Sequence, residues 1–290
     1  YFVIESDKNV DKYIEKLEIL YEDKHLQKSS LEFIKKYLFL GNNQVFNHVT
    51  SKLSDLDMEM IESVPPGGNW QDIPDSTIKK SKRLSQIKKS GGRTTLYGRL
   101  SPDQPSYTIS TYFNRPGNGT FIHYDYDYDS AKGIQNRLIS FREAARLQSF
   151  PDSFRFSGGK GAKLKQIGNA VPPLMAYQIG KKLVNIAGCK NAVDLFCGAG
   201  GLSYGFKMAG MNILLANDNF SQACMTYRNN HPGTILIEGD INKRDCRKKI
   251  TNYLTSKNVD LICGGPPCQG FSHAGKRIID DPRNSLFRRF

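Results

Sequence analysis

The chain has 290 residues, enough for one large or two modest domains with buried cores. Lys and Arg number 41 and Asp and Glu number 28, so the formal net charge is +13. This excess favours a polyanionic partner, with nucleic acid ahead of an anionic membrane. No apolar run approaches the roughly 20 residues of a membrane span and no signal-peptide pattern opens the chain, so we expect a cytoplasmic protein.

The six cysteines lack the Cys-x-x-Cys spacing of zinc sites, and nothing indicates a disulfide framework. We interpret them as reduced thiols, as is usual inside cells. Aspartate alternates with tyrosine from Tyr124 to Asp129, but alternation without a glycine turn does not bring carboxylates onto one ion. We therefore expect no metal site.

Residues 1–130 are predicted to contact nucleic acid. Apolar residues follow helical spacing over residues 1–40, whereas glycine and proline divide residues 61–120 into segments typical of irregular β structure and loops. A basic run with aromatic neighbours lies in this second stretch, and we favour phosphate contacts for it over a merely solvated loop. The predicted DNA-binding residues here are Lys79, Lys80, Lys82, Arg83 and Arg99.

Two helices are predicted between residues 131 and 190. Ser140 and Glu143 form a capping box that opens the first helix. The second begins at Pro172-Pro173, since proline is tolerated in a first turn, and Gly188 ends it.

From residue 191 onward, strands and helices alternate. The predicted strands are 192–196, 213–216, 234–237 and 259–263, and the predicted helices are 202–209, 221–230 and 244–257. Because a helix separates each strand from the next, we predict a doubly wound α/β domain with a parallel sheet and right-handed crossovers.

The first three of these strands end in residues suited to a nucleoside. A glycine-rich turn, Cys197–Gly201, follows the first strand and lets the backbone approach a ligand closely. Asp218 ends the second strand, where an acid can bind both hydroxyls of a ribose, and Asp240 follows the third. The phosphate-binding pattern G-x-G-x-x-G is absent, which favours S-adenosylmethionine over NAD.

Cys268 follows the fourth strand, within the sequence GGPPCQGFS of residues 264–272. Ligand crevices of open α/β sheets lie where strands end, so a thiol on this proline-stiffened turn is placed to attack a ligand. A buried structural cysteine is the alternative interpretation, but the surrounding glycines and prolines favour a nucleophile.

Five motifs together resemble the DNA (cytosine-5) methyltransferases, over roughly residues 45–75 and 93–290. They are DLFCGAGG (194–201), EGDI (238–241), GPPCQGFS (265–272), REAARLQSFP (142–151) and QIGNAVPP (166–173). The family usually places the last two motifs at the end, whereas here they come first, so the chain resembles a circularly permuted member. Domain termini that lie close together permit such a rearrangement.

The resemblance implies the fold of class I S-adenosylmethionine-dependent methyltransferases, a Rossmann-like doubly wound α/β sheet that is partial here, with a small irregular α+β target-recognition domain. The expected domains are 1–130 for the end of target recognition, 131–190 for bridging helices, and 191–290 for cofactor binding and Cys268.

The resemblance also implies a mechanism, in which Cys268 adds to C6 of a flipped-out cytosine and C5 takes the methyl group of S-adenosylmethionine. Arg142, Glu143 and Arg146 are implied to organise the structure and not to catalyse. The implied cofactor-binding residues are Phe196, Gly198, Ala199, Gly200, Gly201, Asp218, Asp240, Ile241, Gly265, Pro267 and Asn169. The loop after Cys268 is implied to contact DNA through Gln269, Ser272, Lys276 and Arg277.

The family's Glu-Asn-Val and Arg-x-Arg motifs are not found in the sequence. With strand order 3-2-1-4-5, the strand before Cys268 would have an unpaired apolar edge, which invites pairing with another chain. We therefore predict a second polypeptide that supplies these motifs, so that this chain is one subunit or portion of a heterodimeric enzyme acting on duplex DNA. The expected setting is a prokaryotic restriction-modification system with a cognate endonuclease.

Three other functions stay open at this point. One is a tRNA cytosine-5 methyltransferase of the same family, which methylation of labelled tRNA would reveal. Another is a catalytically silent DNA-binding subunit that only holds the cofactor, in which Cys268 would never bond to a base. A small-molecule methyltransferase is disfavoured by the positive charge and by the additional N-terminal region.

Overall fold

The computed structural model describes residues 45–124, 136–266 and 286, and the chain divides into two compact units, Tyr1–Ser153 and Phe154–Phe290. We call the first the N-terminal unit and the second the C-terminal unit. The predicted bridging segment, residues 131–190, is divided between them. Within the described residues, no helix combines the length and the apolar character needed to cross a membrane.

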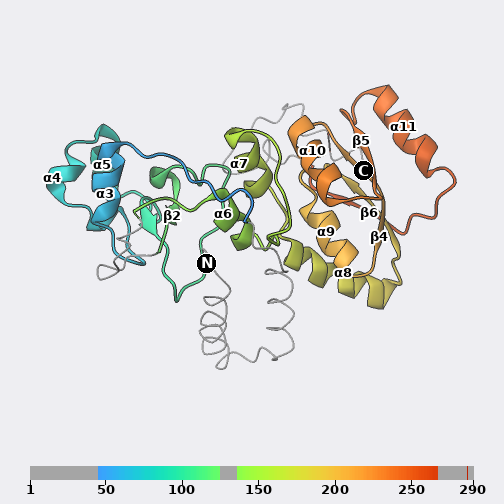
Figure 1. Cartoon of the computed structure of the whole chain (residues 1–290), viewed down its shortest axis with the longest axis horizontal. Helices are drawn as coiled ribbons and strands as arrows, with labels where there is room; N and C mark the ends of the chain where they lie inside the picture. The colour runs from blue at the N-terminus through green and yellow to red at the C-terminus, as the bar shows by residue number, and fades with distance from the viewer. Residues whose placement is uncertain (1–44, 125–135, 267–285, 287–290) are drawn as a thin grey trace. The chain divides into compact units, whose positions relative to one another are not determined.

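The N-terminal unit combines short helices with two short parallel strands (Figure 1). Its elements are α3 (Asp55–Glu62), the 3₁₀ turn η1 (Trp70–Asp72), α4 (Asp75–Ile78), α5 (Lys82–Ser90), β1 (Gly98–Arg99), the 3₁₀ turn η2 (Pro116–Asn118), β2 (Thr120–Ile122) and α6 (Phe141–Leu147). The prediction of β structure and loops over residues 61–120 was wrong for α4 and α5. These helices have 4 and 9 residues, too few turns for a helical period to show in the sequence.

The basic run of the sequence therefore lies on a helix and the turn before it. Ser81 caps α5 by accepting a hydrogen bond from the backbone N–H of Leu84 at 3.2 Å, and Gly91 ends the helix with φ 64°. Leu84 is buried, whereas Lys82 and Lys89 are exposed. One apolar side chain thus anchors a helix whose outer face is basic.

Arg99 is fully buried in the N-terminal unit. Its guanidinium donates hydrogen bonds to the carbonyl oxygens of Val64, Ile61 and His123 at 2.6, 2.7 and 2.8 Å. A fourth bond, of 2.7 Å, goes to Oδ1 of Asn136. The prediction that Arg99 contacts DNA is contradicted by this burial, because the guanidinium faces carbonyl oxygens of its own unit and holds the end of α3.

The capping box predicted at the start of α6 is confirmed. Ser140 Oγ accepts a bond from the backbone N–H of Glu143 at 3.1 Å, and Glu143 Oε2 accepts one from the backbone N–H of Ser140 at 2.7 Å. Arg137 donates two further bonds to the same carboxylate, each of 2.8 Å. Burial acts to raise the pKa of Glu143, but the hydrogen bonds from Arg137 and His123 hold it well below its usual range.

The C-terminal unit is a parallel sheet with helices on both faces, which confirms the predicted α/β class. Its elements are α7 (Lys160–Gly168), α8 (Pro173–Ala187), β3 (Asn191–Leu195), α9 (Gly201–Met208), β4 (Asn212–Asp218), α10 (Ser221–Asn230), β5 (Ile235–Glu238), α11 (Arg244–Leu254) and β6 (Leu261–Gly264). The strand order is β5-β4-β3-β6, as the order 3-2-1-4 predicted. Helix α7 was not predicted, since two of its nine residues are glycine.

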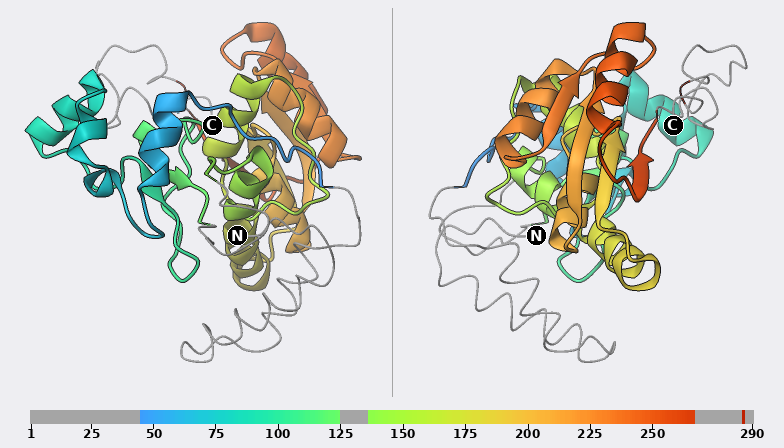
Figure 2. Two further views of the ribbon diagram at one scale, coloured as in Figure 1. Left: turned by 60° about the vertical axis from the view of Figure 1, so that its left-hand side comes forward. Right: turned by 90° about the vertical axis from the view of Figure 1, so that its right-hand side faces the viewer.

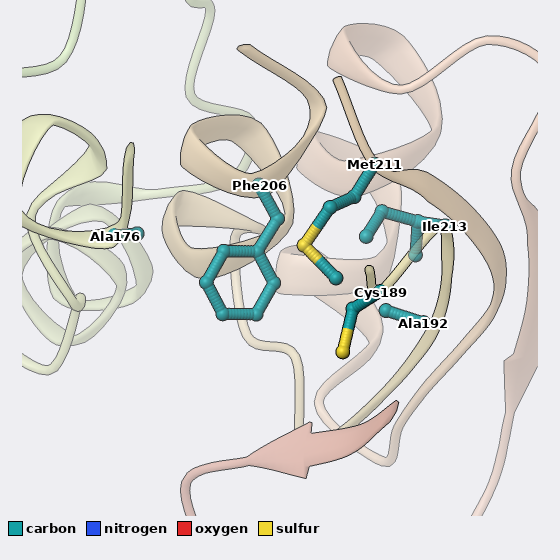
Figure 3. Packing of buried hydrophobic residues seen from close by; sticks show 6 residues of the cluster. All are labelled: Ala176, Cys189, Ala192, Phe206, Met211 and Ile213. Carbon is teal, nitrogen blue, oxygen red and sulfur yellow. The ribbon is translucent and has the colours of Figure 1, made fainter. Parts of the chain in front are cut away.

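The helices of this unit form two layers around the sheet, with α9 and α10 on one side and α11 on the other (Figures 1 and 2). On the first side, Phe206 of α9 and Met211 lie between Ala176 of α8 and the strand residues Ala192 and Ile213 (Figure 3). The opposite face is covered by α11. The central strands β3 and β4 are therefore buried, as their apolar sequences predict, whereas no residue of the outer strands β5 and β6 is fully buried among the described residues.

Helices α8 and α9 approach each other closely at Gly205. A Cβ atom at this position would lie 2.3 Å from the carbonyl oxygen of Pro173 and 2.5 Å from Cβ of Ala176. Neither atom can move without shifting α8, so the contact requires glycine on α9.

We predict that Gly205→Ala lowers the free energy of unfolding of the C-terminal unit by about 1–3 kcal/mol, the usual cost of overpacking a core. Thermal unfolding followed by circular dichroism measures the change. Gly161→Ala on α7 is the matched control, because no atom lies within 4 Å of its added Cβ and alanine favours a helix. A loss of stability in Gly161→Ala equal to that in Gly205→Ala would contradict the steric explanation.

Candidate functional site

A cavity of about 660 Å³ lies at the carboxyl ends of β3, β4 and β5 in the C-terminal unit. This is where open parallel sheets bind their ligands. Nine of the predicted cofactor-binding residues line it: Phe196, Gly198, Ala199, Gly201, Asp218, Asp240, Ile241, Gly265 and Asn169. The residues that the strand ends and the family resemblance indicated therefore lie around one cavity, and their roles in cofactor binding stay predictions.

The glycine-rich turn between β3 and α9 is held by Asp218, at the end of β4. Its Oδ2 accepts a hydrogen bond from the backbone N–H of Gly198 and its Oδ1 accepts one from that of Phe220, both at 2.8 Å. The backbone N–H of Cys197 also donates to the carbonyl oxygen of Asn217 at 3.0 Å. One carboxylate therefore fixes both the turn and the start of α10, and remains on the cavity wall.

Gly200 does not line the cavity but packs behind the turn. Its φ is 96°, and a Cβ atom there would lie 2.2 Å from Nε2 of His231 and 2.8 Å from Cδ2 of Tyr227. The rings of His231 and Tyr227 stack with centroids 4.2 Å apart. Gly200 is therefore required by its backbone conformation and by these rings, and its predicted contact with the cofactor stays a prediction.

His231 was not singled out by the sequence. It is almost fully buried, and this burial lowers its pKa to about 3, so the ring is neutral at physiological pH. A lone histidine far from the recognised motifs gives no sequence signal for such a role. Its place beneath the glycine turn appears only in the folded chain.

Asp240, after β5, accepts a hydrogen bond at Oδ1 from the backbone N–H of Asn242 at 2.9 Å. Asn217, at the end of β4, donates to the carbonyl oxygens of Ile237 and Gly239 at 2.7 and 3.1 Å. These bonds fix the chain that leaves β5 along the cavity. The sequence missed Asn217, although it precedes Asp218 directly.

Helix α7 supplies a part of the wall that the sequence did not predict. Lys165 and Gln166 line the cavity together with the predicted Asn169, which caps the end of α7. The Lys165 ammonium lies 5.7 Å from the centroid of the Phe220 ring, within the range of a cation–π contact. A cationic and an aromatic side chain thus meet at one side of the cavity.

Asp194, on β3, is a further acid on the cavity wall, and it is 1% exposed. Ser203 Oγ donates to its Oδ2 at 2.6 Å, and the Tyr227 hydroxyl donates to Ser203 Oγ at 2.8 Å. Burial raises the pKa of Asp194 to about 7, and the nearby charge of Asp218 adds to the rise, against the opposing effect of the Ser203 bond.

The remaining predicted site residues fall into two groups. Lys79, Lys80, Lys82 and Arg83 are exposed in the N-terminal unit, on and before α5. The others lie outside the described residues: Pro267, Cys268, Gln269, Ser272, Lys276 and Arg277. Their predicted roles in cofactor binding, covalent catalysis and DNA contact stay predictions. Within the described residues, no group of three or more metal-ligating side chains gathers.

A parallel α/β sheet whose strand ends carry a glycine turn and two acids around one cavity defines a class I methyltransferase domain. The profile of the family of C-5 cytosine-specific DNA methylases matches residues 3–185 and 191–290. The chain belongs to this family.

Several curated proteins are similar to parts of the chain. "Type II methyltransferase M.AgeI" of Thalassovita gelatinovora is 48% identical over 97 residues, which are 33% of this chain and 22% of that protein. "Type II methyltransferase M.Sau96I" of Staphylococcus aureus is 40% identical over 132 residues, 46% of this chain and 28% of that protein. "DNA (cytosine-5)-methyltransferase 3" of Arabidopsis thaliana is 36% identical over 149 residues, 47% of this chain and 10% of that protein. The matched segments therefore span less than a third of each relative.

The buried carboxyl of Asp194 predicts how the stability of the C-terminal unit depends on pH. The pKa of Asp194 is higher in the folded than in the unfolded chain, so between about pH 4 and 7 the unfolded chain loses this proton while the folded chain keeps it. The contribution of Asp194 to the free energy of unfolding therefore falls by about 1.4 kcal/mol for each pH unit in this range. Asp194→Asn cannot ionise, so its stability should exceed that of the wild type increasingly across this window. Hydrogen exchange of the slowest β3 and β4 amides measures the difference.

Ser203→Ala is the comparison variant for this prediction. It keeps the carboxyl but removes the bond that stabilises the ionised form, so the fall in stability should extend to higher pH than in the wild type. Parallel curves for wild type and Asp194→Asn between pH 4 and 7 would show that Asp194 ionises normally in the folded protein.

Proposed function

We propose that the chain is one subunit or portion of a DNA (cytosine-5) methyltransferase that moves a methyl group from S-adenosylmethionine to C5 of a flipped-out cytosine. The observation that carries the proposal is the cavity at the ends of β3, β4 and β5, lined by Phe196, Asp218 and Asp240, in a chain of this family. The named activities of the relatives agree with it.

The residues around the cavity fit S-adenosylmethionine, which would supply the electrophilic methyl group. Asp218 is the acceptor for the ribose hydroxyls, since it lies at the end of the second strand of the βαβ order. A Cβ atom on Gly198 would meet no atom within 4 Å, so the backbone of the turn is open to a ligand at that point. The Phe196 ring is the stacking partner for adenine, and Asp240, Ile241 and Asn169 complete the wall.

Cys268 is the proposed nucleophile. Its thiolate bonds to C6 of cytosine, which makes C5 electron-rich enough to take the methyl group; loss of the C5 proton and expulsion of the thiolate then restore the aromatic ring. The supporting observation is that β6 ends at Gly264 and that Gly265 and Pro266 lie on the cavity wall. Cys268 is two positions after Pro266 in the sequence.

A further β strand is proposed to pair with β6, supplied by the second polypeptide. Among the described residues β6 is bonded to β3 alone, and Ile262 on this edge strand is 50% exposed. An apolar strand with an open edge accepts another strand readily. We extend this to a heterodimer in a restriction-modification system with a cognate endonuclease, the setting that the type II names of the relatives suggest.

We also propose that the chain is circularly permuted relative to the usual order of motifs in the family. The family profile matches in two segments separated at residues 186–190, and β3 begins four residues after α8 ends at Ala187. Gly188 ends α8 with φ 64°, so a short turn joins the two elements without strain.

The central test is covalent trapping on duplex DNA that carries 5-fluorocytosine at the recognised site. Fluorine at C5 blocks the final elimination, so the proposed mechanism gives a stable protein–DNA adduct that denaturing electrophoresis detects. The full chain is used with S-adenosylmethionine, with and without the second polypeptide. Cys268→Ser should abolish the adduct, a loss of at least about 100-fold.

Cys263→Ala is the matched control, because this nearby thiol packs against the Val193 carbonyl oxygen at 3.2 Å inside the unit. It should still form the adduct. Trapping that survives in Cys268→Ser would rule out the proposed nucleophile, and methyl transfer by the chain alone would rule out the need for the second polypeptide.

The basic face of α5 is proposed to contact the DNA backbone. Lys82 and Lys89 are exposed on α5 and Lys79 is exposed at the end of α4, whereas Lys80 and Lys88 form ion pairs with Glu59 and Asp75. Arg83 already donates a hydrogen bond to the carbonyl oxygen of Gly117 at 2.7 Å, so fewer of its N–H groups are free to bind a phosphate. Backbone contacts of this kind position a protein on DNA without reading sequence.

We predict that the double variant Lys82→Ala, Lys89→Ala weakens binding to duplex DNA and reduces the slope of log K against log [salt] by about 2, since each phosphate contact contributes about 0.9. Fluorescence anisotropy across a salt series measures both. Lys248→Ala, Lys249→Ala on α11 removes the same charge from exposed positions and is the control. Equal changes in the two variants would mean that only net charge matters.

A further inference from the structure

The segment of residues 154–157, which we call the strap, leads from the N-terminal unit to helix α7. The N-terminal unit ends at Ser153, so the strap is the first part of the C-terminal unit. Helix α7 begins at Lys160 and supplies residues of the cavity wall. Phe154 and Phe156 of the strap are only 1% and 4% exposed. The strap is therefore a packed part of the C-terminal unit and not a solvated linker.

Hydrogen bonds to side chains of α10 fix the backbone of the strap. The backbone N–H of Arg155 donates to Oδ1 of Asn230, and Nδ2 of Asn230 donates to the carbonyl oxygen of Arg155, both at 2.9 Å. The backbone N–H of Ser157 donates to Oγ1 of Thr226 at 2.8 Å. These bonds satisfy backbone groups of the strap as a neighbouring strand would, and they hold it in one conformation along the helix.

The Phe154 ring packs against the rings that lie behind the glycine turn. Its centroid is 6.0 Å from that of His231 and 5.7 Å from that of Tyr204, and both pairs are edge-to-face with interplanar angles of 69°. Aromatic rings attract each other in this arrangement. His231 in turn fills the space beside Gly200, where an added Cβ atom would lie 2.2 Å from Nε2 of its ring. Phe154 thus acts on the glycine turn through His231.

The other end of the strap holds a residue of the cavity wall. Gln166 of α7 is 4% exposed, and its Nε2 donates to the carbonyl oxygen of Ser157 at 3.0 Å. The same helix places Lys165 and Asn169 on the wall. The strap is therefore tied to the cavity at two places, through Phe154 to the glycine turn and through Ser157 to α7.

We propose that Phe154 is a positioning residue for the cofactor cavity, which holds His231 against the glycine turn, and that a bound cofactor in return holds the strap in its packed position. The inference rests on the proposed function, since it takes the cavity to be the cofactor site. A ligand on the turn needs Gly198 in place, and looser rings behind the turn reduce the fraction of molecules in which it is in place. Because such linkage is reciprocal, the ligand stabilises the packed strap by the same factor.

The first experiment is isothermal titration calorimetry of the full chain with S-adenosylhomocysteine. Phe154→Leu keeps most of the apolar volume but removes the ring edge, so the variant should fold. If its turn is in place in about one tenth of the molecules, the dissociation constant rises about tenfold. His231→Leu should give a similar loss, and the double variant should lose little more, because Phe154 acts through His231.

Phe113→Leu in the N-terminal unit is the matched control. Phe113 is 1% exposed, and its ring packs edge-to-face on that of Phe141 with centroids 5.7 Å apart. The substitution therefore removes the same ring from an equally buried place that is outside the C-terminal unit. It should lower the stability of the N-terminal unit and leave the affinity for S-adenosylhomocysteine unchanged.

Hydrogen exchange separates positioning from a general loss of stability, because the Arg155 and Ser157 amides report on the strap itself. In the wild type, saturation with S-adenosylhomocysteine should slow their exchange by about tenfold, within the usual range of coupling between sites. In saturated Phe154→Leu the slowing should be about twofold or less, while the β3 and β4 amides are still slowed by the ligand. A purely structural role would leave the response of the strap amides unchanged.

The outcomes separate this inference from the proposed function. Unchanged affinity in Phe154→Leu, or an equal loss in Phe113→Leu, would overturn the inference alone. So would strap amides that do not respond to the ligand in the wild type, a measurement that needs no variant. Failure of the wild-type chain to bind S-adenosylhomocysteine would overturn the proposed function as well.

Discussion

The site depends on the two hydrogen bonds that the Asp218 carboxylate accepts from the backbone. One fixes Gly198 in the turn after β3 and the other fixes Phe220 at the start of α10, each at 2.8 Å. Neighbouring parallel strands bring these segments together, because β3 and β4 are paired up to Leu195 and Asn217. Without this carboxylate, one N–H group of the turn and one at the start of α10 would lose their acceptor.

Packing against two aromatic rings and a close contact between two helices also hold this turn in place. His231 and Tyr227 occupy the space that a side chain at position 200 would need. Gly205 then lets α9, which begins at the end of the turn, lie against α8. The position of the turn is therefore set by the rings behind it and by the contact of α9 with α8.

Two aspartates one strand apart illustrate how environment separates chemical roles. Asp218 lies on the cavity wall with a backbone donor on each oxygen, so it holds the turn in place. Asp194 is buried, and this burial raises its pKa to about 7 in spite of the hydrogen bonds from Ser203. Glu143 in the N-terminal unit is also buried, but the hydrogen bonds from Arg137 outweigh the effect of burial and lower its pKa.

The sequence by itself determined the class of the C-terminal unit, its strand order and nine of the residues that line the cavity. Parallel strands are buried on both faces and end at one edge, so their apolar runs and terminal residues can be found by position alone. Only the tertiary structure decided the roles of Arg99, Asp194 and His231. Each is an ordinary polar residue in the sequence, and its burial depends on neighbours that are distant along the chain. The short helices α4 and α5 escaped prediction for a related reason, since their stability comes from packing and not from a visible period.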